Sequence, residues 1–68
     1  MAAVLKAYRE LRAGDQVRDE RDGRPMRFVN CTDVLWDGGL RYRFEREDGT
    51  TLDRYQHPVE WVLVIGRA

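Results

Sequence analysis

The chain has 68 residues, which suffice for one small domain and are too few for a large buried core. Charged residues make up 35% of it, but 12 basic and 12 acidic residues cancel to a formal net charge of zero. This balance excludes a global field that would attract nucleic acid or an anionic membrane, so such a role needs a local patch. We expect a single domain over residues 1–68.

The single cysteine, Cys31, excludes an intramolecular disulfide. A chain this small that is built for an oxidising compartment usually carries several disulfides. Residues 1–6 do not show the basic stretch followed by a long apolar stretch that marks a signal peptide. The longest apolar run, residues 61–65, is far too short to span a bilayer. We therefore expect a cytoplasmic protein with no membrane association.

An amphipathic pattern near the N-terminus predicts a helix over residues 2–12. Apolar residues recur at i, i+1, i+4 and i+7 from Val4, and charged residues occupy most of the other positions. Gly14 is a suitable helix stop. Because so short a helix is marginal by itself, its apolar stripe should lie on a sheet.

Three Asp-Gly pairs divide the middle of the chain into short segments rich in β-branched and aromatic residues. Asp-Gly supplies the positive φ angles that tight hairpin turns require. The pairs are Asp22-Gly23, Asp37-Gly38 and Asp48-Gly49. Their spacing predicts a mainly β domain with about five antiparallel strands over residues 14–65.

The first strand is expected over residues 16–20. The second begins at Pro25, which cannot donate a ladder hydrogen bond inside a sheet. Polar residues from Asn30 to Asp33 predict a bulge before the apolar segment 34–36.

The third strand, residues 40–45, has the clearest alternation in the chain. One face is apolar and the other is charged; the apolar residues are Leu40, Tyr42 and Phe44, and the charged ones are Arg41, Arg43 and Glu45. A fourth strand is expected over residues 51–53, followed by a short helical turn over 55–58.

The last strand, residues 61–65, is apolar on both faces. A strand in an open antiparallel sheet normally presents one polar face to water. We expect one face to line the core, with Trp61 as a core residue, and the other to lie beneath the N-terminal helix. A homodimer interface on the second face is the alternative. Residues 66–68 are expected to form a loose tail.

Two short motifs resemble those of known small barrels. Gly14-Asp15-Gln16-Val17-Arg18 looks like the Gly-Asp-x-Val opening of the first strand in many SH3-like barrels, which include Tudor and KOW modules. Arg24-Pro25-Met26 is similar to the start of the second strand in small bacterial proteins of the YodC-like type. The resemblance covers residues 14–65 and implies an SH3-like barrel that binds nucleic acid or protein. The N-terminal helix and the long charged third and fourth strands depart from it.

The sequence contains no catalytic or metal-binding motif. His57 is the only histidine, so a typical zinc site is not expected. Nothing indicates that Cys31 and His57 meet as a nucleophile and its base, and we expect Cys31 to be buried as a small hydrophobe. The acidic residues near the first turn lack EF-hand spacing; they are Asp19, Glu20 and Asp22. We therefore expect a non-enzymatic protein with no cofactor and no metal.

Another protein is the favoured partner. Exposed tryptophan is enriched in binding hot spots, and Trp36 flanks the second turn. Leu40 and an exposed Met26 are expected to complete the contact surface. The chain is then an accessory or regulatory binding module.

RNA or single-stranded DNA is the alternative partner. Outward-facing arginines on neighbouring strands can hold successive phosphates, and rings beside them can stack on bases. The residues concerned are Arg27, Arg41, Arg43, Arg54 and Tyr55, with Trp36 as a second ring. Acidic residues are interleaved with these arginines, which favours an ordinary solvated face.

Overall fold

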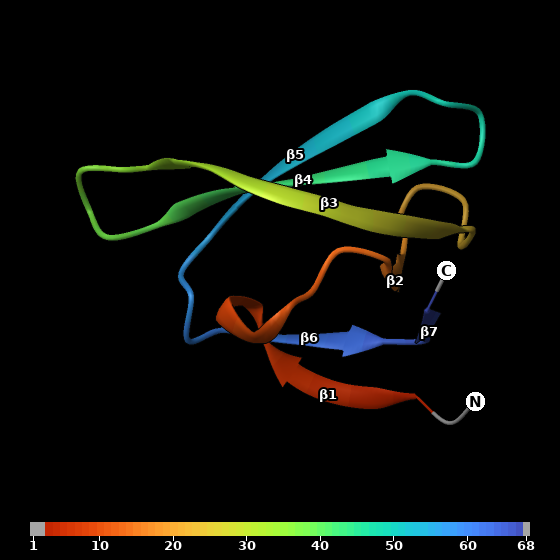
Figure 1. Cartoon of the computed structure of the whole chain (residues 1–68), viewed down its shortest axis with the longest axis horizontal. Coiled ribbons are helices and arrows are strands. Elements are labelled where there is room, and N and C mark those ends of the chain that lie inside the picture. The colour runs from red at the N-terminus through yellow and green to blue at the C-terminus, as the bar shows by residue number, and fades with distance from the viewer. Residues whose placement is uncertain (1–2, 68) are drawn as a thin grey trace.

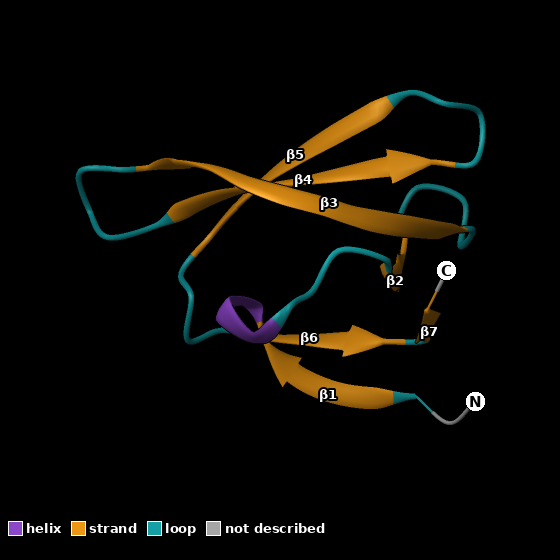
Figure 2. Cartoon of the chain, in the orientation of Figure 1, coloured by secondary structure: helices purple, strands orange, loops and turns teal. Residues whose placement is uncertain are grey.

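The computed structural model of the chain describes residues 3–67, and their strands form two antiparallel sheets (Figures 1 and 2). The larger sheet has the strand order β5-β4-β3-β2-β7, and the smaller pairs β1 with β6. The strands are β1 (Val4–Ala7), β2 (Asp15–Arg18), β3 (Pro25–Val34), β4 (Leu40–Arg46), β5 (Thr51–Gln56), β6 (Trp61–Val64) and β7 (Gly66–Arg67). The mainly β class is confirmed, but residues 3–67 form two sheets and no closed barrel.

The Asp-Gly pairs form the turns that connect β2 to β3, β3 to β4, and β4 to β5. In each pair the glycine has a positive φ, of 75°, 85° and 87° in chain order. Each aspartate carboxylate accepts a hydrogen bond from the backbone N–H two residues later, at 3.0, 3.0 and 2.9 Å. This local bond favours the turn over extended backbone. The three predicted hairpin turns are therefore confirmed.

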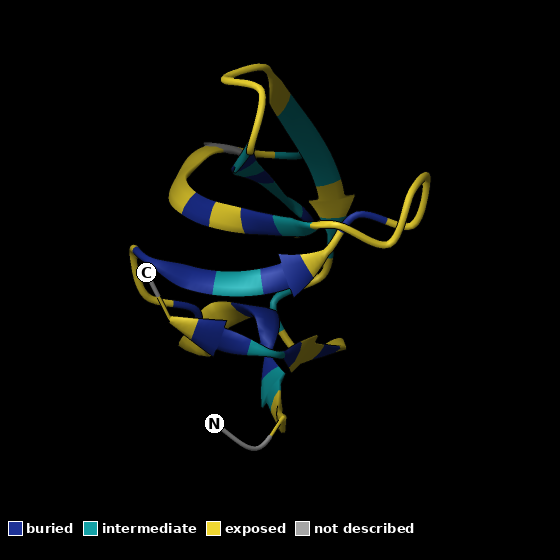
Figure 3. Cartoon of the chain, turned by 90° about the vertical axis from the view of Figure 1, so that its right-hand side faces the viewer, coloured by how far each residue is buried: buried dark blue, intermediate teal, exposed yellow. Residues whose placement is uncertain are grey.

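The core lies between the two sheets. It contains buried apolar residues from both; they are Tyr8, Leu11, Val17, Met26, Phe28, Tyr42, Phe44, Val62 and Val64. The aromatic rings at its centre are tilted against one another, with centroids 5.0 to 6.0 Å apart. Buried and exposed residues alternate along the strands (Figure 3), and the alternation predicted for β4 is confirmed.

Two irregularities interrupt the pairing of β3 with β4. The register shifts between Phe28 and Asn30 and again between Cys31 and Asp33. The predicted bulge is therefore confirmed, as is the beginning of the strand at Pro25. Cys31 is exposed, so its predicted burial is wrong. Cys31 lies between the two register shifts, where a bulge inserts an extra residue and breaks the inward–outward alternation of the strand.

The predicted helix over residues 2–12 is wrong. Residues 4–7 form β1, and only Tyr8–Glu10 form a single turn of 3-10 helix; Ala2 lies outside the described residues. β1 pairs with β6, the most apolar strand, with Val4 opposite Val64. Because an isolated helix of this length is marginal in water, pairing with β6 outweighs the local helical pattern.

The second face of the last strand is uncovered. Val62 and Val64 are buried, whereas Trp61 is 69% exposed and Leu63 is 45% exposed. No helix lies over them within residues 3–67, so the predicted core position of Trp61 is wrong. Leu5 lies directly across from Leu63 and is also exposed, at 63%.

Three smaller predictions also need correction. Met26 is 1% exposed because it pairs with Val17, which faces the core, so it is not a surface residue. β5 continues to Gln56, and a backbone turn closed by a bond from Glu60 N–H to the His57 carbonyl replaces the helical turn. The tail is partly ordered because β7 pairs with β2. Ala68 lies outside the described residues.

Candidate functional site

Trp36 is almost completely exposed, at 98%, in the turn between β3 and β4. The turn forms one end of the molecule (Figure 1). Leu35 N–H donates to the Gly39 carbonyl at 2.7 Å, and Gly38 N–H donates to the Leu35 carbonyl at 3.0 Å. The Asp37 carboxylate accepts from Gly39 N–H at 3.0 Å. The indole is therefore presented on a turn fixed by three hydrogen bonds.

The end of β5 lies beside this turn. His57 Nε2 is 3.8 Å from an Asp37 carboxylate oxygen, and Arg41 is directly across from Tyr55. The Arg41 guanidinium carbon lies 5.0 Å from the centre of the Tyr55 ring, in a cation–π arrangement. Tyr55 is 54% exposed.

We call three residues the hairpin-tip surface: Trp36, Arg41 and Tyr55. Two of them, Trp36 and Tyr55, are large exposed hydrophobic side chains. Val34 is also exposed, but it pairs with Leu40 and so lies on the other face of the sheet from Arg41 and Tyr55. Tryptophan, tyrosine and arginine are the residue types that interfaces contain most often relative to other surfaces. Of the predicted binding residues, Trp36, Arg41 and Tyr55 lie at this end of the molecule, and Arg41 and Tyr55 are in contact. Leu40 is partly buried and packs against the core.

Two of the predicted phosphate-binding arginines have carboxylates as neighbours across the strands. Arg27 forms an ion pair with Glu45. Arg43 donates two hydrogen bonds to Asp53, at 3.0 and 3.3 Å. The bonds from Arg43 hold the pKa of Asp53 below its ordinary value of 3.8. A phosphate would have to compete with these carboxylates.

Arg54 lies on a different face from the other arginines. It is directly across from Tyr42, a core residue, and its guanidinium carbon lies 5.5 Å from the centre of the Phe44 ring. Its Nη1 donates to the Tyr8 hydroxyl at 3.3 Å, and its Nη2 is 3.9 Å from Glu20. Arg41 and Arg43 occupy the alternate positions of β4, so Arg54 does not extend their row.

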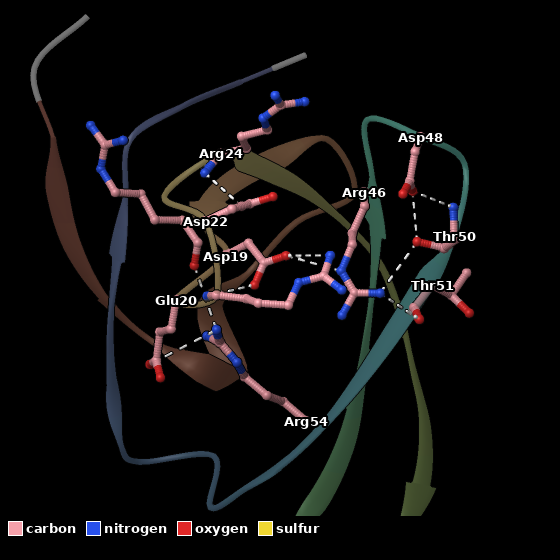
Figure 4. A network of polar contacts seen from close by, with 11 residues as sticks. Asp19, Glu20, Asp22, Arg24, Arg46, Asp48, Thr50, Thr51 and Arg54 are labelled. Atoms are coloured by element: carbon pink, nitrogen blue, oxygen red, sulfur yellow. Dashed lines mark hydrogen bonds and ion pairs between the residues drawn. The ribbon is translucent and has the colours of Figure 1, made fainter.

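A polar network, which sequence reasoning missed, surrounds Asp19 (Figure 4). Asp19 is 4% exposed, and its carboxylate accepts hydrogen bonds from Arg21 N–H at 3.0 Å and from Arg46 Nε at 2.9 Å. The bond from the Arg21 backbone and the nearby guanidinium of Arg46 hold the pKa of Asp19 below 3.8. Arg46 also donates to the Thr50 hydroxyl at 3.2 Å. We call these residues the Asp19 network; it joins the β2–β3 turn to the β4–β5 turn.

Asp15 is a second buried carboxylate, 2% exposed. It accepts hydrogen bonds from Lys6 Nζ at 3.2 Å and from Arg12 N–H at 2.9 Å. Its place in the Gly-Asp-x-Val motif was visible in the sequence, but its partners were not. Both buried carboxylates are bound by basic or backbone donors, which assigns them a structural role.

Among residues 3–67, no group of three His, Cys, Asp or Glu side chains is placed to hold a metal ion. The same residues contain no helix that is long and apolar enough to cross a membrane. Comparisons with protein families, with curated proteins and with solved structures find no match to the chain.

Proposed function

We propose that this chain is a non-enzymatic binding module that recognises another protein through the hairpin-tip surface. The observation that carries the proposal is the 98% exposure of Trp36 on a hydrogen-bonded turn. Burial of this large side chain in a partner would remove apolar surface from water and so contribute favourable binding free energy. Since the turn is already ordered, less conformational entropy is lost on binding.

The neighbouring residues define the kind of partner. At the same end of the molecule as the indole, the stacked Arg41 and Tyr55 add amphipathic surface. Such a patch fits a concave apolar pocket that accepts the indole and has a polar rim. The module then acts as an accessory or regulatory factor for the protein that carries this pocket.

RNA or single-stranded DNA is the alternative ligand. The stacked pair of Arg41 and Tyr55, at the same end of the molecule as an exposed indole, is the observation that favours it, since bases stack on such rings. The carboxylates beside Arg27 and Arg43 weigh against it. The formal net charge of zero weighs against it as well.

The test compares two exposed tryptophans, one in the β3–β4 turn and one in β6. Biotinylated wild-type, Trp36→Ala and Trp61→Ala proteins are used to capture partners from an extract of the native host, and each captured protein is purified and titrated by calorimetry. We expect Trp36→Ala to weaken binding by about 30-fold, the equivalent of a hot-spot loss of about 2 kcal/mol. Trp61→Ala controls for the loss of an exposed indole as such. Equal affinity of wild type and Trp36→Ala would contradict the proposal.

A further inference from the structure

β1 has one unpaired edge. It lies at the margin of the molecule, on the side of β6 away from the five-stranded sheet (Figure 1), and pairs only with β6 among residues 3–67. Tyr8 N–H donates to the Glu60 carbonyl at 2.8 Å, in line with the register of β1 and β6. Because backbone groups alternate in direction along an antiparallel strand, those of Val4 and Lys6 point towards β6. Those of Leu5 point outwards, and an extension of the strand by one residue would turn those of Ala3 the same way.

β1 contains none of the features that usually prevent an edge strand from pairing with another strand. Natural edge strands are protected by outward charges, proline or bulges. β1 contains no proline, and its register with β6 is continuous. Its one charged residue, Lys6, reaches Asp15 at 3.2 Å instead of the edge. A two-stranded sheet by itself is also marginal, and additional strands stabilise it.

A second contact restricts how another strand can bind. Ala7 N–H, which also points away from β6, donates to the Glu10 carboxylate at 3.0 Å. An added strand therefore finds open backbone groups at Leu5, and at Ala3 once β1 extends by one residue, while the N–H of Ala7 is already bound to Glu10. This leaves two residues for pairing, centred on Val4.

We infer that β1 pairs with β1 of a second copy of the chain, antiparallel, across a two-fold axis at Val4. In this register Ala3 of one copy and Leu5 of the other exchange both backbone hydrogen bonds, and the symmetry repeats the exchange. The product is a four-stranded sheet in the order β6-β1-β1-β6.

The charges and the exposed apolar side chain at the edge of β1 favour a second copy of the chain as the binding partner. Lys6 is held by Asp15, so no like charges on β1 meet across the axis. The chain has no net charge, so two copies do not repel each other as a whole. The exposed side chain of Leu5 gains apolar contacts at the new seam.

Site-directed cross-linking tests the register. In a Cys31→Ser background, Val4→Cys places two thiols at a non-hydrogen-bonded pair, where Cα atoms are about 4.5 Å apart and a disulfide fits. Leu5→Cys is the matched control, because the two Leu5 positions are diagonal neighbours about 7–8 Å apart. We expect Val4→Cys to form a covalent dimer under mild oxidation at least tenfold faster than Leu5→Cys.

Sedimentation of the unmodified wild-type chain at micromolar and tenfold lower concentration supplies an independent measurement. The expected result is a dimer whose fraction falls on dilution. A monomer at both concentrations, or Val4→Cys that cross-links no faster than Leu5→Cys, would overturn the inference. Neither result depends on the hairpin-tip surface, so the proposed function is tested separately.

Discussion

Tyr42 is 2% exposed, and its hydroxyl has no hydrogen-bond partner among residues 3–67. Its ring packs 5.0 Å from the ring of Tyr8, centre to centre. Burial, together with Cys31 and Tyr8, raises the pKa of Tyr42 above its ordinary value of 10.0. The ring therefore stabilises the core, whereas the buried hydroxyl loses its hydration without a replacement bond.

We predict that Tyr42→Phe leaves the free energy of unfolding unchanged or raises it by about 1 kcal/mol. Because the pKa is raised in the folded state, stability in the wild type should fall as the pH rises above 10, and the substitution should remove this part of the loss. Tyr8→Phe is the matched control. It removes the acceptor for Arg54 and should lower the free energy of unfolding by about 1 kcal/mol. Urea unfolding at pH 7 and at alkaline pH gives both values; a larger loss from Tyr42→Phe than from Tyr8→Phe would contradict this account.

At the scale of elements, the Asp19 network ties two turns of neighbouring hairpins together (Figure 4). The lowered pKa of Asp19 means that the unfolded chain binds the proton more readily than the folded chain. This stabilisation is present above pH 3.8, the ordinary value, and is lost as the pH falls through the folded-state pKa. We predict that Asp19→Asn lowers the urea midpoint at pH 7 and flattens its decline as the pH falls below 3.8.

The control for this prediction is Glu47→Gln, which removes an exposed carboxylate from the β4–β5 turn. It should leave the acid dependence close to that of the wild type. Some dependence should also persist in Asp19→Asn, because Asp48 and Asp53 have lowered pKa values too. An acid profile identical to that of the wild type would show that Asp19 contributes nothing to acid stability.

The elements that the sequence predicts correctly are those with local causes. Each Asp-Gly turn is made by a glycine and a carboxylate within three residues, and the alternation of Tyr42 and Phe44 follows from the period of a strand. The exposure of Trp36 was also predictable, because it follows from its place beside such a turn.

The elements that the sequence predicts wrongly depend on distant partners. The apolar residues from Val4 onwards fit a helix or a short strand, and only pairing with β6 decides between them. Asp19 finds Arg46 at a separation of 27 residues, so no local signal indicates that its carboxylate is buried. The place of Trp61 at the start of the most apolar strand predicts a core position, but no helix within residues 3–67 covers that face of β6.

At the scale of the whole molecule, the hairpin-tip surface and the open edge of β1 belong to different sheets. A dimer formed through β1 would therefore carry two hairpin-tip surfaces in one particle. Two linked sites raise the apparent affinity for a partner that itself presents two pockets, without any new contact. Dimerisation through β1 would therefore strengthen binding through the hairpin-tip surface.

The balance of charge across the molecule favours the proposed protein partner over nucleic acid. Binding to phosphates needs cations that are free to release counterions, and here 12 basic and 12 acidic residues cancel, with Arg43 bound to Asp53. We predict that short RNA and single-stranded DNA produce no chemical-shift changes in the labelled protein at low salt. Arg41→Glu with Arg43→Glu is the matched variant and should behave like the wild type. Shifts confined to the strands of Arg41, Arg43 and Arg54, lost at moderate salt and in the double variant, would instead establish the nucleic-acid function.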